Sequence, residues 1–210
     1  REQAAKIITY MLVGQEAADK LVTTIAPYSD VAANRWSAGS IAYCTNEGII
    51  AGDGNGKFAP TESVLGLQFA KMLLVALGYD PQIEKLVGNS WAINTAKLAA
   101  SAGLDKGLDV SLSAALTREQ AAQMAFNAMK ANIVEYDTQT NIDIGGGSSI
   151  VIGNKKAYNV TTSRDWGKNI YNDPEKEGGK KKYQRRGAFP LCSPEKQFLC
   201  TATGITMEAR

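Results

Sequence analysis

The pentapeptide REQAA occurs twice in this chain, at residues 1–5 and 118–122, and each copy opens a stretch whose apolar residues recur at helical spacing. The full stretches read REQAAKIITYMLV (residues 1–13) and REQAAQMAFNAMKA (residues 118–131). A third stretch, LGLQFAKMLLVALG at residues 65–78, keeps the Gln-x-Ala core but has no arginine. Because an internal repeat marks a recurring structural unit, we predict three equivalent long helices and a mainly α fold.

A second block also occurs twice and begins with a tryptophan: WSAGSIAYCTNEGIIAG starts at Trp36, and WAINTAKLAASAGLDKG starts at Trp91. The two copies lie 55 residues apart, and in each a glycine stands 12 and again 16 positions after the tryptophan. Their apolar spacing predicts a short helix that ends at the first glycine and is followed by a turn. A repeat therefore consists of a tryptophan, a short helix, a glycine turn, a loop and a long helix.

The start of the last long helix has the sequence of a cap. Thr117 stands at the N-cap position and Gln120 follows three residues later, which is typical of a capping box. We expect the apolar faces of the three long helices to form the core of a bundle rather than a cofactor pocket. These faces carry Ile7, Ile8, Met11, Phe69, Met72, Leu73, Met124, Phe126 and Met129.

The stretch GDGNGKF at residues 52–58 begins like a calcium-binding loop. Such a loop needs oxygen ligands where Lys57 and Val64 stand and a glycine where Phe58 stands, so most of the required ligands are missing. We interpret the stretch as a tight turn that links two helices, with Phe58 and Pro60 folded back as an anchor. No metal site is expected.

The composition argues against several classes of function. The 210 residues include no histidine and only three cysteines without a CxxC pair, so neither a zinc site nor a disulfide scaffold is indicated. The missing histidine also removes the commonest general base, and we predict no enzymatic activity, no catalytic residues and no cofactor. Residues 1–163 hold 13 Lys/Arg against 15 Asp/Glu, which argues against nucleic acid as a partner. No apolar run is long enough to insert into a membrane.

The central repeat resembles the S-layer homology (SLH) family of bacterial cell-surface anchors. The family's elements F-x-D-V, W-A, G-I-I-x-G, G-x-F-x-P and I-T-R-A-E-F-A correspond in order to YSDV (28–31), WS (36–37), GIIAG (48–52), GKFAP (56–60) and VLGLQFA (64–70). The resemblance covers roughly residues 1–134. The first repeat is reduced to its final helix, and the third lacks the Asp-Val and G-x-F-x-P elements.

The resemblance implies a pseudo-threefold helical domain with a central three-helix bundle, and grooves that bind a secondary cell-wall polysaccharide, in some relatives one that carries a pyruvate ketal. It implies non-covalent anchoring of a surface protein to the bacterial cell wall, and an extracellular location. An arginine at a helix N-terminus suits a ketal carboxylate because it offers a bidentate fork beside backbone N–H groups. The expected ligand-binding residues are Arg1, Asp30, Trp36, Gln68, Trp91, Thr117, Arg118 and Glu119.

Several of these residues have an alternative structural interpretation. Trp36 and Trp91 suit a platform for a sugar ring, but each also suits a packing anchor at the start of a short helix. Asp30 suits a cap on the turn that precedes the first tryptophan. Arg118 and Glu119 lie in a first helical turn and can simply be solvated.

The central repeat departs from the family at Gly66, which stands where the family has arginine. Its groove is therefore expected to lack the carboxylate clamp, with Gln68 supplying only neutral hydrogen bonds. Two other functions stay open. The chain can be the anchor fragment of a wall- or polysaccharide-degrading hydrolase, or a structural module that self-associates in a surface lattice. A carboxylate pair in a cleft would favour the hydrolase, and none stands out in the sequence.

We predict three segments. Residues 1–134 form the repeats, divided at 1–24, 25–80 and 81–134. Residues 135–172 form a β-hairpin, as a linker or the start of another domain, because the sequence near 141–162 alternates apolar and polar residues around a Gly-Gly-Gly turn. Residues 173–210 form a basic, irregular and disordered tail, in which Cys192 and Cys200 either pair or stay as free thiols.

Overall fold

The computed structural model describes residues 1–109, 111–145, 148–158 and 205–207. Six helices and four strands lie in these ranges: α1 (Glu2–Val13), α2 (Gln15–Asp19), β1 (Leu21–Thr23), α3 (Ala38–Asn46), α4 (Gly66–Ala76), α5 (Trp91–Ser101), α6 (Arg118–Lys130), β2 (Ile133–Gly145), β3 (Ser148–Tyr158) and β4 (Ile205–Met207). The fold is mainly α, as the repeats predict.

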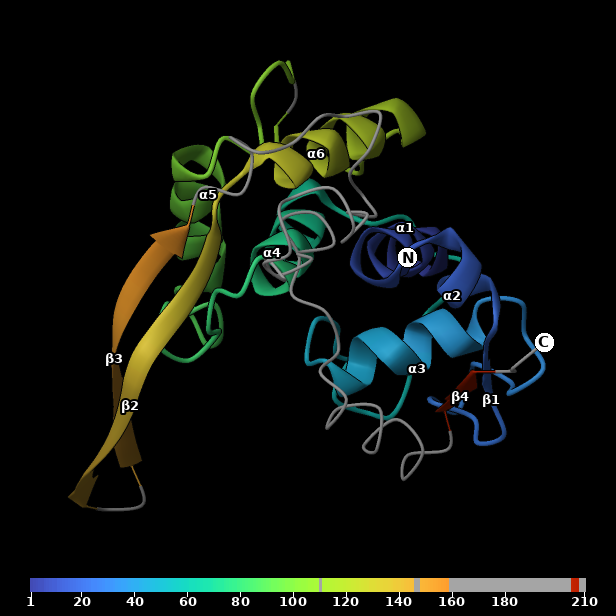
Figure 1. The fold of residues 1–210 in the computed structure, drawn as a ribbon, viewed down its shortest axis with the longest axis horizontal. Coiled ribbons are helices and arrows are strands. Elements are labelled where there is room, and N and C mark those ends of the chain that lie inside the picture. Colours follow the sequence, from blue (N-terminus) through green and yellow to red (C-terminus); the bar gives the residue numbers. More distant parts are fainter. Residues whose placement is uncertain (110, 146–147, 159–204, 208–210) are drawn as a thin grey trace, which may run out of the picture.

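The three long helices α1, α4 and α6 contact one another and form the central bundle (Figure 1). Their apolar faces meet in the core, where Ile8, Phe69 and Met124 have no exposed surface. One residue of the predicted core is placed wrongly by the sequence pattern: Phe126 is 40% exposed, and its ring lies under the Lys130 ammonium at 3.7 Å from the ring centroid. The flank of α6 that carries Phe126 therefore faces away from the bundle.

The short helices α3 and α5 pack against α1 and α4 respectively. Helix α3 ends at Asn46 and α5 at Ser101, and a glycine with positive φ follows each: Gly48 at 68° and Gly103 at 71°. Glycine adopts this left-handed conformation without the Cβ clash of other residues. The predicted short helices with glycine turns are confirmed.

The hairpin of β2 and β3 is confirmed, but it begins before the predicted stretch. The strands pair antiparallel, with Ile142 opposite Ile150, and extend away from the helices (Figure 1). The base of β2 belongs to the helical core, because the Val134 N–H donates to the Leu77 carbonyl at 2.8 Å at the end of α4. The strand thus starts inside the segment that the sequence assigns to the repeats.

A short strand beyond the hairpin, β4, pairs with a strand near the start of the chain. Strand β4 pairs antiparallel with β1, with Leu21 opposite Met207, which the predicted irregular tail did not anticipate. The other predictions for the tail, including those for Cys192 and Cys200, concern residues outside the described ranges. Among the helices of the described part, none combines the length and apolarity needed to cross a membrane.

Candidate functional site

Two adjoining cavities lie at the N-terminal ends of the long helices. The Trp36 cavity has a volume of about 600 Å³ and lies between α1, the loop that precedes α4, and the start of α6. The Trp91 cavity has a volume of about 420 Å³ and lies between α4, the loop after α3, and the start of α5. Arg1 and Val64 line both cavities. The two cavities therefore adjoin at these two residues.

The Trp36 cavity collects half of the residues that the sequence predicts for ligand binding. Arg1, Trp36, Thr117 and Arg118 all line it. Trp36 is 58% exposed, so its indole is not a buried packing anchor. An exposed indole at the rim of a cavity presents an apolar face to a ligand ring and an N–H to a ligand oxygen.

The start of α6 is organised as the sequence predicts. The Thr117 hydroxyl accepts the Gln120 N–H at 3.2 Å, and the Gln120 side-chain oxygen accepts the Thr117 N–H at 2.9 Å, which completes the capping box. Arg118 is exposed, and its backbone N–H has no protein acceptor within the described residues. Glu119 is also exposed but lines neither cavity. The first turn of α6 thus offers a guanidinium and a helix N-terminus to the Trp36 cavity.

A clamp that the sequence analysis missed holds Trp36 in place. The Glu2 carboxylate accepts Arg35 Nε at 2.8 Å, Arg35 Nη2 at 3.0 Å and Ser37 Oγ at 2.6 Å. Arg35 and Ser37 are the two neighbours of Trp36 in the chain, so the clamp ties the tryptophan to the start of α1. The hydrogen bonds from Arg35 hold the pKa of Glu2 below its ordinary value.

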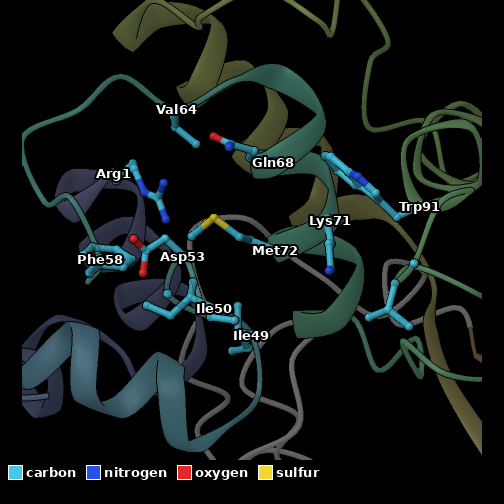
Figure 2. Close-up of a pocket in the computed structure, with 14 residues that line it drawn as sticks. Arg1, Ile49, Ile50, Asp53, Phe58, Val64, Gln68, Lys71, Met72 and Trp91 are labelled. Atoms are coloured by element: carbon cyan, nitrogen blue, oxygen red, sulfur yellow. The ribbon is translucent and has the colours of Figure 1, made fainter. Parts of the chain in front are cut away.

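The Trp91 cavity contains a cation that the sequence analysis also missed. Gln68, Lys71 and Met72 of α4 line the cavity together with Trp91. Figure 2 shows Lys71 and Trp91 on the side opposite Arg1 and Asp53, with Gln68 and Met72 between them. Lys71 Nζ lies 5.8 Å from the centroid of the Trp91 ring, and burial lowers the pKa of this ammonium. Residues three apart on a helix lie on one face, which is the signal that places Lys71 beside Gln68.

Gln68 has a structural role as well as a place in the cavity. Its side-chain oxygen accepts the Leu65 N–H at 3.1 Å, so it caps α4 from within the first turn. Leu65 has no side-chain acceptor to return, so α4 has only half of a capping box. The amide NH₂ of Gln68 is the part of this side chain that can serve a ligand.

The structure explains why glycine replaces arginine at position 66. A Cβ atom on Gly66 would lie 2.7 Å from the Cα of Leu112 and 2.8 Å from its carbonyl oxygen. The Gly66 N–H donates to the Ala114 carbonyl at 3.0 Å, and the Leu67 N–H donates to the Leu112 carbonyl at 2.7 Å. The segment before α6 therefore covers the start of α4, and these N–H groups are not available to an anion.

Asp30 lines neither cavity, and its carboxylate is engaged by backbone groups. It accepts the Phe58 N–H at 2.8 Å and the Ala59 N–H at 2.7 Å, and the bond from Phe58 is the main reason that its pKa is lowered. The sequence predicts Asp30 as a cap on the turn before Trp36, whereas in the structure it caps the later turn at residues 56–59. Asp30 is thus a structural residue in the described chain.

The turn interpretation of GDGNGKF is confirmed. One Asp53 carboxylate oxygen accepts the Asn55 N–H at 2.8 Å and the Lys57 N–H at 3.0 Å. Phe58 is buried, its ring stacks on Tyr28 with centroids 5.4 Å apart, and the Arg1 guanidinium lies 5.0 Å from its centroid. The turn therefore anchors Arg1 where the two cavities meet. Among the described residues, no group of three or more His, Cys, Asp or Glu is placed to hold a metal ion.

The comparison with protein families identifies one segment that lines both cavities. Residues 27–70 match the family model described as the S-layer homology domain. This part of the chain is an S-layer homology domain. The match includes Trp36, the turn with Phe58, and Gln68, so the predicted family is confirmed on the residues that carry the resemblance.

Three curated relatives share more of the chain than the S-layer homology domain alone. The "Cell surface protein" of Thermoanaerobacter kivui is 26% identical over 136 residues, 65% of this chain and 17% of the relative. The "Middle cell wall protein" of Brevibacillus brevis is 26% identical over 167 residues, 77% of this chain and 15% of the relative. The "Surface layer protein" of Brevibacillus choshinensis is 25% identical over 134 residues, 62% of this chain and 12% of the relative.

The chain spans less than a fifth of the length of each of these relatives. The S-layer homology domain and the relatives indicate a location at the cell surface and support a role in anchoring there, as the sequence predicts. The names of the relatives describe surface and wall proteins rather than enzymes. That the chain has no enzymatic activity stays a prediction.

Proposed function

We propose that this chain anchors a surface protein to the bacterial cell wall by binding an acidic secondary cell-wall polysaccharide, one that carries a pyruvate ketal. The observation that carries the proposal is the Trp36 cavity, in which an exposed tryptophan lies with two arginines at the starts of helices. The exposed indole covers the apolar face of a sugar ring, and the guanidinium groups bind its carboxylate.

Arg118 is the principal carboxylate ligand in this proposal. Its side chain lines the cavity and makes no ion pair with a described residue. A guanidinium binds a carboxylate through two parallel N–H bonds, and the N-terminus of α6 adds a favourable dipole and free N–H groups. Thr117 contributes through its capping role, because the capping box fixes the direction of the first turn from which Arg118 extends.

The Trp91 cavity is the second place for the same ligand chemistry. Gly66 leaves this cavity without the expected arginine, and Lys71 supplies the positive charge instead. An ammonium that is partly desolvated gains more from a carboxylate than a fully hydrated one does. Lys71 beside Trp91 therefore offers a point charge and an aromatic face in the repeat that the sequence alone assigns to neutral hydrogen bonds.

The test is retention of the purified chain on cell-wall sacculi, measured by co-sedimentation. Wild type is expected to bind intact sacculi and to lose binding after the secondary polymer is removed chemically. Arg118→Ala is expected to weaken binding about tenfold or more, the size of a lost charge-assisted contact. Lys97→Ala is the matched control, because it also removes one positive charge. Lys97 is exposed on α5 and lines neither cavity.

Equal retention of wild type and Arg118→Ala would contradict the site, and retention on sacculi that lack the polymer would contradict the ligand. The relative named as a surface layer protein favours one second candidate, self-association in a surface lattice. Sedimentation of the chain alone, at the concentration used for the sacculi, distinguishes the two. Pelleting without wall material would support the lattice module instead.

A further inference from the structure

The two cavities share two lining residues but differ in the tryptophan that lines each of them. Arg1 and Val64 line both, whereas Trp36 lines only the larger cavity and Trp91 only the smaller. We propose that one chain of an acidic polysaccharide occupies both cavities at once and passes over Arg1 and Val64, the two residues that line both. This inference rests on the proposed function and extends it, since it assigns the chain an extended binding site for polymer rather than two separate sites for single acidic sugars.

Each cavity carries its own aromatic and cationic groups. The larger has Trp36 with Arg118, and the smaller has Trp91 with Lys71. Arg1 stands between them, and its guanidinium lies over the Phe58 ring at 5.0 Å from the centroid. A polymer with an acidic group on each repeating unit presents successive carboxylates to these three cations.

Acidic side chains also line the cavities, and most of their charge is already engaged. Glu2 is held by Arg35 and Ser37, and Asp53 accepts two backbone N–H groups. Glu62 lines the larger cavity and is exposed. In the described chain a ligand thus meets three cations, Arg118, Arg1 and Lys71, against the exposed carboxylate of Glu62.

The shared guanidinium favours one chain over two. Two separate acidic ligands would compete for Arg1, because a single guanidinium binds one carboxylate bidentately at a time. A continuous chain has no such conflict, since its second contact forms within the complex at a high effective concentration. The consequence is a dependence of affinity on polymer length.

The experiment is isothermal titration calorimetry with fragments of acidic wall polysaccharide that contain one to six repeating units. Affinity is expected to rise roughly 100-fold or more between one unit and the shortest fragment that reaches both cavities. The long fragment is expected to bind with a stoichiometry of one. An affinity that does not change with length, or two long fragments per protein, would overturn the inference and leave the proposed function standing. If no fragment binds at all, both fail.

Variants of the two ends distinguish one spanning chain from two sites. If one chain spans, Trp36→Ala lowers the affinity for the long fragment to near the one-unit value with the stoichiometry still one, and Trp91→Ala does the same. Lys71→Gln replaces Trp91→Ala should that variant fail to fold. With independent sites, each substitution would instead leave one site of unchanged affinity. Ile93→Ala is the control, because Ile93 is 75% exposed and lines neither cavity.

Discussion

Replacement of Glu2 by glutamine tests the clamp that fixes Trp36 at the rim of its cavity. The carboxylate accepts three hydrogen bonds, two from Arg35 at 2.8 and 3.0 Å and one from Ser37 at 2.6 Å. Glutamine keeps one oxygen but turns an NH₂ group toward donors, so the ion pair is lost and a donor is left without its acceptor. Because the two partners flank Trp36, we expect losses of both stability and wall binding.

The burial of the pair sets the magnitude of the loss. Hydrogen bonds to charged groups contribute roughly 1.5–3 kcal/mol, and removing one partner of a buried ion pair costs about 3–5 kcal/mol. The side chain of Glu2 is 12% exposed and that of Arg35 is 31% exposed, so solvent screens part of this energy. Glu2→Gln should therefore lower the free energy of unfolding by about 2–3 kcal/mol.

Urea unfolding followed by circular dichroism measures this loss. The matched control is Glu119→Gln, which changes the same residue of the other REQAA copy. The Glu119 carboxylate is exposed and makes no hydrogen bond or ion pair with another described residue. The control should shift the free energy of unfolding by less than about 0.5 kcal/mol, as is usual for surface substitutions. Equal losses in the two variants would refute the clamp as the origin of the effect.

One change of pH and three further substitutions have defined outcomes. Wild type should lose its stability advantage over Glu2→Gln in acid, because the pKa of Glu2 in the folded protein is below its ordinary value of 4.5. The advantage should start to fall below pH 4.5 and disappear as the pH passes through the lowered pKa, which acid titration followed by circular dichroism will detect. Gly66→Arg restores the family's residue but should destabilise the domain by about 1–3 kcal/mol in urea unfolding, because its Cβ meets Leu112. Thr95→Val should be neutral or stabilise by up to about 1 kcal/mol in the same assay, since the buried Thr95 hydroxyl has no hydrogen-bond partner among the described residues. Thr9→Val should instead destabilise, because that hydroxyl donates to the Ala5 carbonyl at 2.8 Å.

The parts of the fold that depend on local sequence could be predicted. The capping box at Thr117 and Gln120 and the glycine turns after the short helices are set by neighbouring residues, and the structure has them where the sequence places them. The start of the hairpin could not be predicted this way. Ile133 and Val134 follow directly on a helical repeat, and they form a strand because they pair with Tyr158 and Ala157 of β3. The Leu77 carbonyl, also distant in sequence, accepts the Val134 N–H and ties this strand to α4.

The candidate site shows the same division. Trp36 and Arg118 stand at recognisable positions in the repeat, so sequence reasoning could name them. Arg35 has its role only through Glu2, which lies 33 residues away, and no local pattern indicates that pairing. Helical spacing could have placed Lys71 beside Gln68. Its contact with the Trp91 ring depends on where α5 packs in the fold, which no local pattern indicates.

The repeats also show why a glutamate in this motif has no fixed role. Glu2, Leu67 and Glu119 occupy the same position in the three long helices. The central helix has Leu67 at this position, so it has no carboxylate. In the tryptophan block that follows it, Ser90 and Ala92 stand where the first block has Arg35 and Ser37, so the guanidinium is missing as well. A clamp persists only where a carboxylate and its donors occur in consecutive repeats. The glutamate of REQAA is therefore structural in its first copy and exposed in its second, and only the block packed against each helix decides which.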